Sequence, residues 1–288
     1  MNKNNGKIEP ELLGIKKAST FTGFCSKHDD GLFSKIEKAT FEATPEQCFL
    51  CGYRAISREL YTKEALANSS PLRRDADKGK PPAEQNLWQT FNFLFDAGLA
   101  SGVGDSSRLK SEYDKILLDE KYHGSRAYVL KLTDPPPIMC AAGWFPTRDF
   151  DGNELQDLMK LSEPAIGMTC TSFSSDGNGY IVFQWLAEND AVCQQFITSL
   201  ARMNNDDLTN ALVRLWFQHF ENIFMQPDWW EALNNETQAS LVDRMARSAN
   251  PFTEQLVHPL ADDGVVVPAW DIVARKMVGF NIDDGQSY

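Results

Sequence analysis

The chain has 288 residues, of which 42% are hydrophobic and 24% are charged; this ordinary globular composition excludes a wholly disordered, collagen-like or coiled-coil chain. The formal net charge is −12, so the acidic part of the chain is not expected to bind nucleic acid. The length is large for one domain and sufficient for two.

The sequence also indicates a compartment. The first eight residues, MNKNNGKI, lack the apolar core of a secretory signal, and no stretch approaches the length of about eighteen apolar residues that a membrane span needs. Six cysteines are too few for a disulfide scaffold in a chain of this size. We therefore expect a cytoplasmic protein without a membrane span, whose thiols are free or bound to metal.

The first long helix is predicted after Thr44. Thr44 is a good N-cap, Pro45 suits the first helical position and Gln47 completes a capping box. An apolar stripe follows at helical spacing, formed by Phe49, Tyr53, Ile56 and Leu60. These signals predict a helix of about six turns that ends near Asn68.

The segment 71–83 is charged and contains several prolines, so it is predicted to be a linker or exposed loop and the boundary between two parts of the chain. The first part, residues 1–70, would be an N-terminal element, and residues 84–288 would form the body. Two helices are expected next, over 84–100 and 108–122, with Gly102 and Gly104 interrupting them.

Residues 126–186 favour strands. Four short β-favouring runs occur at 128–130, 138–140, 168–171 and 180–183, and the turn sequence DGNG at 176–179 predicts a hairpin between the last two. Helices are expected again over 191–203, 206–225, 229–233 and 237–248, with an edge strand at 265–267. The predicted fold class is α+β, mostly helical, with a small antiparallel sheet of about four strands in the middle of the chain.

One set of residues is typical of a metal site. Cys25 and His28 form a C-x-x-H pair, Cys48 and Cys51 form a C-x-x-C pair, and nineteen residues lie between His28 and Cys48. Two such pairs can surround zinc with a closed tetrahedral shell, which would make the ion structural. Two other interpretations stay open: the cysteines simply pack in a core, or a different metal arrangement uses only some of the four residues.

The sequence around the first pair also resembles a known segment. LGIKKASTFTGFCSKHD at 13–29, followed by LF at 32–33 and IE at 36–37, is similar to a segment of a bacterial protein family for which no activity is known. The resemblance covers roughly residues 12–62 and includes Cys25, His28 and Asp29, whereas Cys48 and Cys51 depart from it. Asp29 would then be a neighbour that orients a metal-bound His28.

Other candidate residues have ordinary explanations. His28 and Asp29 spell the dipeptide of the HD metal hydrolases, but the remaining histidines lie in unrelated contexts. His219 and Glu221, two residues apart on a predicted helix, should point away from each other and form no shared site. Arg58 lies one helical turn after Arg54, and such a pair is expected to form salt bridges with neighbours or to be solvated.

Trp229 and Trp230 are adjacent, and both cannot enter one core from the same helix face, so one is expected to face a partner or cleft unless the helix is wedged between two layers. With no recognised catalytic signature, the first hypothesis is a non-catalytic, zinc-stabilised protein that binds another protein. The alternative is a metal-dependent hydrolase or nuclease that uses His28 and Asp29. A third hypothesis, based on the resemblance, is a component of a bacterial multi-protein system of the defence type. The sequence leaves open whether the protein is an enzyme.

Overall fold

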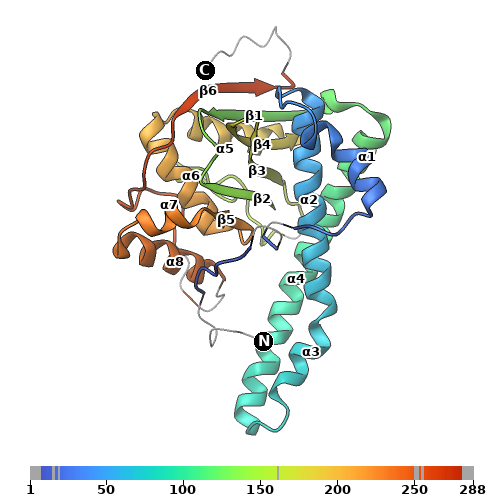
Figure 1. Cartoon of the computed structure of the whole chain (residues 1–288). Coiled ribbons are helices and arrows are strands. Elements are labelled where there is room, and N and C mark those ends of the chain that lie inside the picture. The colour runs from blue at the N-terminus through green and yellow to red at the C-terminus, as the bar shows by residue number, and fades with distance from the viewer. Residues whose placement is uncertain are drawn as a thin grey trace.

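The computed structural model describes residues 8–14, 17–18, 20–160, 162–249, 253 and 256–280. In this part of the chain, eight α-helices surround one six-stranded antiparallel sheet (Figure 1). The expected α+β class is confirmed, with six strands instead of about four.

The sheet has the strand order β5-β2-β3-β4-β1-β6. Its strands are β1 (Ser125–Leu132), β2 (Ile138–Trp144), β3 (Met168–Ser175), β4 (Asn178–Leu186), β5 (Ile223–Met225) and β6 (Ile272–Val278). The four expected runs are β1 to β4. The hairpin turn between β3 and β4 is also as expected, because Asp176 and Gly177 both have positive φ, at 49° and 79°.

Both additional strands lie at edges of the sheet, where sequence signals are weak. The expected edge strand at 265–267 is not a strand: Val267 is buried, and its N–H donates to Oδ1 of Asn210 at 3.0 Å. β6 lies several residues later and carries Arg275 and Lys276, polar residues that are common on edge strands.

The helices are α1 (Ser26–Glu37), α2 (Pro45–Asn68), α3 (Ser70–Arg74), α4 (Pro82–Asp119), α5 (Asp190–Ala201), α6 (Asn205–His219), α7 (Pro227–Ala232) and α8 (Asn235–Ala249). The start and end of α2 are confirmed, including the complete capping box between Thr44 and Gln47. The expected break near Gly102 is wrong, because α4 runs through it as a single helix of 38 residues. Glycine weakens a helix by only about 1 kcal/mol, and packing of α4 against α2 supplies the support.

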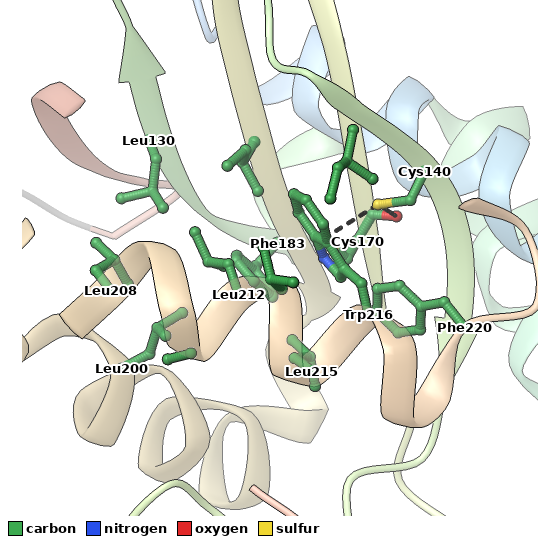
Figure 2. Close-up of a cluster of buried hydrophobic side chains, with 14 of the residues drawn as sticks. Leu130, Cys140, Cys170, Phe183, Leu200, Leu208, Leu212, Leu215, Trp216 and Phe220 are labelled. Atoms are coloured by element: carbon green, nitrogen blue, oxygen red, sulfur yellow. Dashed lines mark hydrogen bonds between the residues drawn. The ribbon is translucent and has the colours of Figure 1, made fainter. Parts of the chain in front are cut away.

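Helices cover both faces of the sheet (Figure 1). Alternate residues of β1 point to opposite sides, so Leu130 packs with α5 and α6 whereas Val129 packs with α2. Figure 2 shows the core on the α6 side, where Leu212 and Trp216 of α6 lie beneath Phe183 of β4. This arrangement gives a three-layer body of helix, sheet and helix.

On the other face, α2 lies directly on the sheet. Gly52 of α2 faces Gln184 of β4, and Tyr113 of α4 donates a hydrogen bond of 2.5 Å to Oε1 of Gln184. Gln184 is completely buried, so this bond satisfies a polar group that would otherwise be costly inside the core.

The outer parts of α2 and α4 leave the body together as a helical hairpin with α3 near its tip (Figure 1). The charged segment 71–83, expected as a linker or exposed loop, connects the two helices of this hairpin. Its side chains are partly ordered by ion pairs: Arg73 and Arg74 both bind Asp96, at 2.6 and 2.9 Å. Since α2 packs on the sheet, the N-terminal region shares its core with the rest of the chain.

Candidate binding groove

A groove of about 670 Å³ lies at the base of the hairpin. It lies where α2 and α4 meet the edge of the body formed by β2 and the end of α6. A volume of this size is within the usual range of small-ligand sites, which is roughly 300–1,000 Å³.

One wall of the groove is apolar and belongs to α4. Its side chains share one face of the helix because they recur at spacings of three and four residues; they are Phe91, Leu94, Phe95 and Leu99. Gly98 interrupts this wall, and a Cβ at position 98 would meet no atom within 4 Å. The glycine therefore leaves the groove wider at its centre.

The opposite wall is polar. Arg58 lies on α2, and Glu59 forms an ion pair of 3.1 Å with Lys63 one turn later. Burial lowers the pKa of Arg58 below its ordinary value, while the charges of Glu59 and Glu221 act in the opposite direction. Arg54, by contrast, binds Glu37 at 2.6 Å and lies over the ring of Phe33, so only Arg54 has the salt bridge expected for the pair.

His219 and Glu221 also line this groove, so the expectation that they share no site is wrong. That expectation assumed a helix through Met225, whereas α6 ends at His219. Phe220 is extended, with φ −112° and ψ 124°, and its ring packs edge-on against Trp144 at 5.0 Å. Helical spacing therefore no longer applies at Glu221, and both side chains reach one groove.

His219 is an exposed residue at the C-terminal end of α6. Desolvation by neighbouring protein atoms, followed by the positive charge of Arg244, lowers the pKa of His219 below its ordinary value. The neighbouring Asn222 is buried and donates to the carbonyl of Ala141 at 2.9 Å, which fixes the chain between α6 and β5. The groove thus combines the unpaired guanidinium of Arg58, the ion pair of Lys63 with Glu59, the carboxylate of Glu221 and the imidazole of His219.

The four residues expected to bind zinc lie in different environments. Cys25 and His28 are exposed at the start of α1, with 3.3 Å between the Cys25 Sγ and the His28 Nδ1 atoms. Cys48 and Cys51 are buried between α2 and the sheet, in a cluster that includes Val129 and Val182. Among the residues that the structure describes, no three Cys, His, Asp or Glu side chains are placed together to hold a metal ion.

The two buried thiols have the environment of core side chains. Burial raises the pKa of Cys48 to about 12 and raises the pKa of Cys51 further, so both remain protonated at neutral pH. A zinc ligand must be a thiolate. The surroundings of Cys48 and Cys51 favour the packed-cysteine interpretation, and the zinc site stays a prediction.

Asp29 contacts Arg54 at 3.7 Å, and within the described part of the chain its side chain forms no hydrogen bond with His28. The hydrolase alternative needs further ligands next to His28 and Asp29, and the described residues supply no group of three. That alternative also stays a prediction.

The adjacent tryptophans are both packed. Trp229 is only 8% exposed, and Trp230 stacks on Phe217 of α6 with 6.3 Å between the ring centroids. Both contact the same main core, and Trp230 keeps part of its surface exposed, so partner binding by this pair stays a prediction. The stacking of Trp230 on Phe217 places the short helix α7 against α6.

The outer part of the hairpin differs from the rest of α4 in its content of charged residues. Only three of the 26 residues at 82–107 are charged, compared with six of the 12 residues at 108–119. The first stretch exposes large apolar side chains, among them Leu87, Phe93 and Leu94, which are 70%, 67% and 58% exposed. No helix in the described residues, α4 included, is long and apolar enough to cross a bilayer.

Comparison with protein-family models, with curated proteins and with solved structures gives no match for this chain.

Proposed function

We propose that the protein is a non-catalytic component that binds another protein in the cytoplasm, and that the outer half of the α2–α4 hairpin is the docking element. The observation that carries the proposal is the charge-poor stretch of α4, which exposes Leu87, Phe93 and Leu94 on a hairpin that projects from the body (Figure 1). Exposed apolar side chains grouped in this way are typical of protein interaction sites.

The shape of the hairpin adds support. Two helices alone cannot enclose a core, so their apolar side chains remain exposed unless a further helix covers them. A partner that lays an apolar helical face on α4 would bury these side chains in the manner of a helix-in-groove complex. The bacterial resemblance of residues 12–62 is consistent with a role in a multi-protein assembly of the defence type.

The test compares two leucine substitutions on one helix. Leu87 and Leu118 are both exposed on α4, at 70% and 82%, but Leu87 lies in the charge-poor stretch and Leu118 in the charged one. The full chain, carrying an affinity tag, is purified from the cells it comes from as wild type, Leu87→Glu and Leu118→Glu. We expect one partner to co-purify in equal amounts with wild type and Leu118→Glu, and to be lost with Leu87→Glu.

Equal recovery of the partner with Leu87→Glu would contradict the proposal, as would a monomeric chain without a co-purifying protein. Recovery of a second copy of the chain, lost in the same variant, would identify the partner as the protein itself. Circular dichroism must show equal folding of the three proteins.

A further inference from the structure

The base of the hairpin has a chemical feature that its outer end lacks: an arginine without a partner. Arg58 is half-buried in the groove, and its guanidinium makes no hydrogen bond or ion pair with any described residue; its backbone carbonyl accepts a hydrogen bond from the Thr62 hydroxyl at 2.9 Å. Each of the other arginines with comparable or greater burial in the described part binds a carboxylate or a carbonyl; they are Arg54, Arg73, Arg108, Arg126, Arg148, Arg214, Arg244 and Arg275.

The acidic side chains around Arg58 do not satisfy its guanidinium. Glu59 is held by Lys63 at 3.1 Å, and the same lysine donates to Ser106 at 3.0 Å. Glu221 is exposed and influences Arg58 through space, without a hydrogen bond between them. A partly desolvated guanidinium in this situation gains strongly from an anion that can accept two of its hydrogen bonds.

The rest of the groove restricts what this anion can be attached to. Phe91, Leu94 and Phe95 form an apolar wall on the opposite helix, and Gly98 leaves space between them and the polar wall. The lowered pKa of His219 favours the uncharged form of its imidazole on the polar side. The groove is therefore suited to a ligand that is apolar over most of its length and anionic at one end.

We propose that this groove binds an amphiphilic carboxylate, with its apolar body against Phe91 and Phe95 and its carboxylate on the guanidinium of Arg58. Two sources carry this chemistry: a free aromatic or aliphatic acid, and the C-terminal carboxylate of a peptide with apolar last residues. The proposal does not rest on partner binding by the outer half of the hairpin: the two surfaces share Leu94, but Leu87 and Phe93 do not line the groove and Arg58 does.

Isothermal titration calorimetry of the full chain tests the proposal with matched probes. The free acid is 4-phenylbutyrate and its neutral counterpart is 4-phenylbutanamide; the peptide arm uses acetyl-Ala-Leu-Phe with a free or an amidated C-terminus. The protein variants are Arg58→Gln, Glu221→Gln and the control Arg202→Gln, which removes an exposed arginine outside the groove.

We expect at least one acid to bind and its amide to bind about tenfold to a hundredfold more weakly, because the amide lacks the charge that Arg58 recognises. Arg58→Gln should cause a similar loss, Arg202→Gln none, and Glu221→Gln should tighten binding about threefold by removing a like charge. Binding of 4-phenylbutyrate alone would identify the ligand as a free acid, and binding of the peptide alone would identify it as a peptide C-terminus.

Three results would overturn the proposal: no binding by either acid, equal binding of acid and amide, or equal binding by wild type and Arg58→Gln. Equal melting temperatures of all variants exclude unfolding as the cause of a loss. Binding of both acids would support the proposal and show that the groove recognises the shared end group.

Discussion

Gly52 on α2 lies so close to Gln184 on β4 that a Cβ at position 52 would stand 1.8 Å from the Oε1 atom of Gln184. No side chain larger than hydrogen fits there, and the contact lets α2 lie flat on the sheet. Because the same helix continues outward into the hairpin, this contact also sets where Arg58 and the groove are placed.

Gly52→Ala is therefore expected to lower the free energy of unfolding by about 1–3 kcal/mol, the usual cost of overpacking a tight core. The control is Gly104→Ala on α4, where a new Cβ would meet no atom within 4 Å. That substitution should raise the free energy of unfolding by roughly 0.5–1 kcal/mol, because alanine is the better helix former. Urea unfolding measures both changes in the free energy of unfolding. Equal changes for Gly52→Ala and Gly104→Ala would contradict the close contact between Gly52 and Gln184.

Loss of the Tyr113 hydroxyl is expected to destabilise the protein through the same buried glutamine. Tyr113→Phe removes the 2.5 Å bond to Gln184 and leaves its Oε1 with only a long contact of 3.4 Å from Thr169. A buried acceptor left without a good donor costs about 1–3 kcal/mol. Urea unfolding should show this loss, and an unchanged unfolding midpoint would mean that Gln184 finds another donor.

Single substitutions separate a zinc site from packed cysteines. If Cys48 and Cys51 only pack, Cys48→Ser should cost about 1–3 kcal/mol by burying an unpaired hydroxyl, whereas the exposed Cys25→Ser and His28→Ala should change stability by less than about 0.5 kcal/mol. If the four residues bind zinc, all of these variants should lose the metal and the stability together. Urea unfolding and elemental analysis of the same samples distinguish the two results.

Thiol labelling gives a second test of the same question. Cys25 is exposed, whereas burial holds the pKa of Cys48 at about 12, so iodoacetamide at pH 8 should modify Cys25 within minutes and spare Cys48 and Cys51 until the protein unfolds. Mass spectrometry of the peptides reads out each site. Rapid labelling of Cys48 or Cys51 after addition of a chelator would instead support a bound metal.

The ion pairs of Asp263 with Arg214 and Arg244 predict that the stability of the protein depends on pH. Burial acts to raise the pKa of Asp263, but the hydrogen bond from Arg244 and the charges of Arg244 and Arg214 outweigh it, so the pKa of Asp263 lies below its ordinary 3.8. A carboxyl group with a lowered pKa stabilises the folded state above about pH 3.8, and this contribution is lost as the pH falls through its folded pKa.

Asp263→Asn should accordingly cost about 2 kcal/mol at pH 7, because the buried guanidinium of Arg244 loses its anion and that of Arg214 keeps only Asp262. The difference from wild type should shrink as the pH falls below 3.8. Asp262→Asn is the control, because the side chain of Asp262 is 81% exposed and such pairs contribute at most about 1 kcal/mol. Urea unfolding across pH 3–7 checks the prediction, and a constant difference would contradict it.

Features set by neighbouring residues could be predicted from the sequence. The α2 start follows from Thr44 and Gln47, and the β3–β4 turn follows from Asp176 and Gly177, because capping and turn geometry act over a few residues. Features set by distant contacts could not. The helical pattern of the sequence continues past His219, whereas α6 ends there and the chain goes on to pair β5 with β2.

The groove could not be predicted from the sequence for the same reason. Arg58, His219 and Phe95 come from three helices that are far apart in the sequence, and no spacing rule connects them. The packing of Trp229 and Trp230 on a single core likewise depends on α6 passing beneath α7. The low number of charged residues along 82–107 is a local signal in the sequence for the exposed apolar surface of the hairpin.

Crosslinking from α4 tests most directly whether the outer half of the hairpin binds a partner. A photoreactive phenylalanine is placed at Phe93, or at Leu118 as the control, and the cells are irradiated before lysis. If the outer half of the hairpin binds a partner, we expect one specific protein to be crosslinked from position 93 and none from position 118. The same pattern from both positions, or no crosslink from position 93, would contradict it.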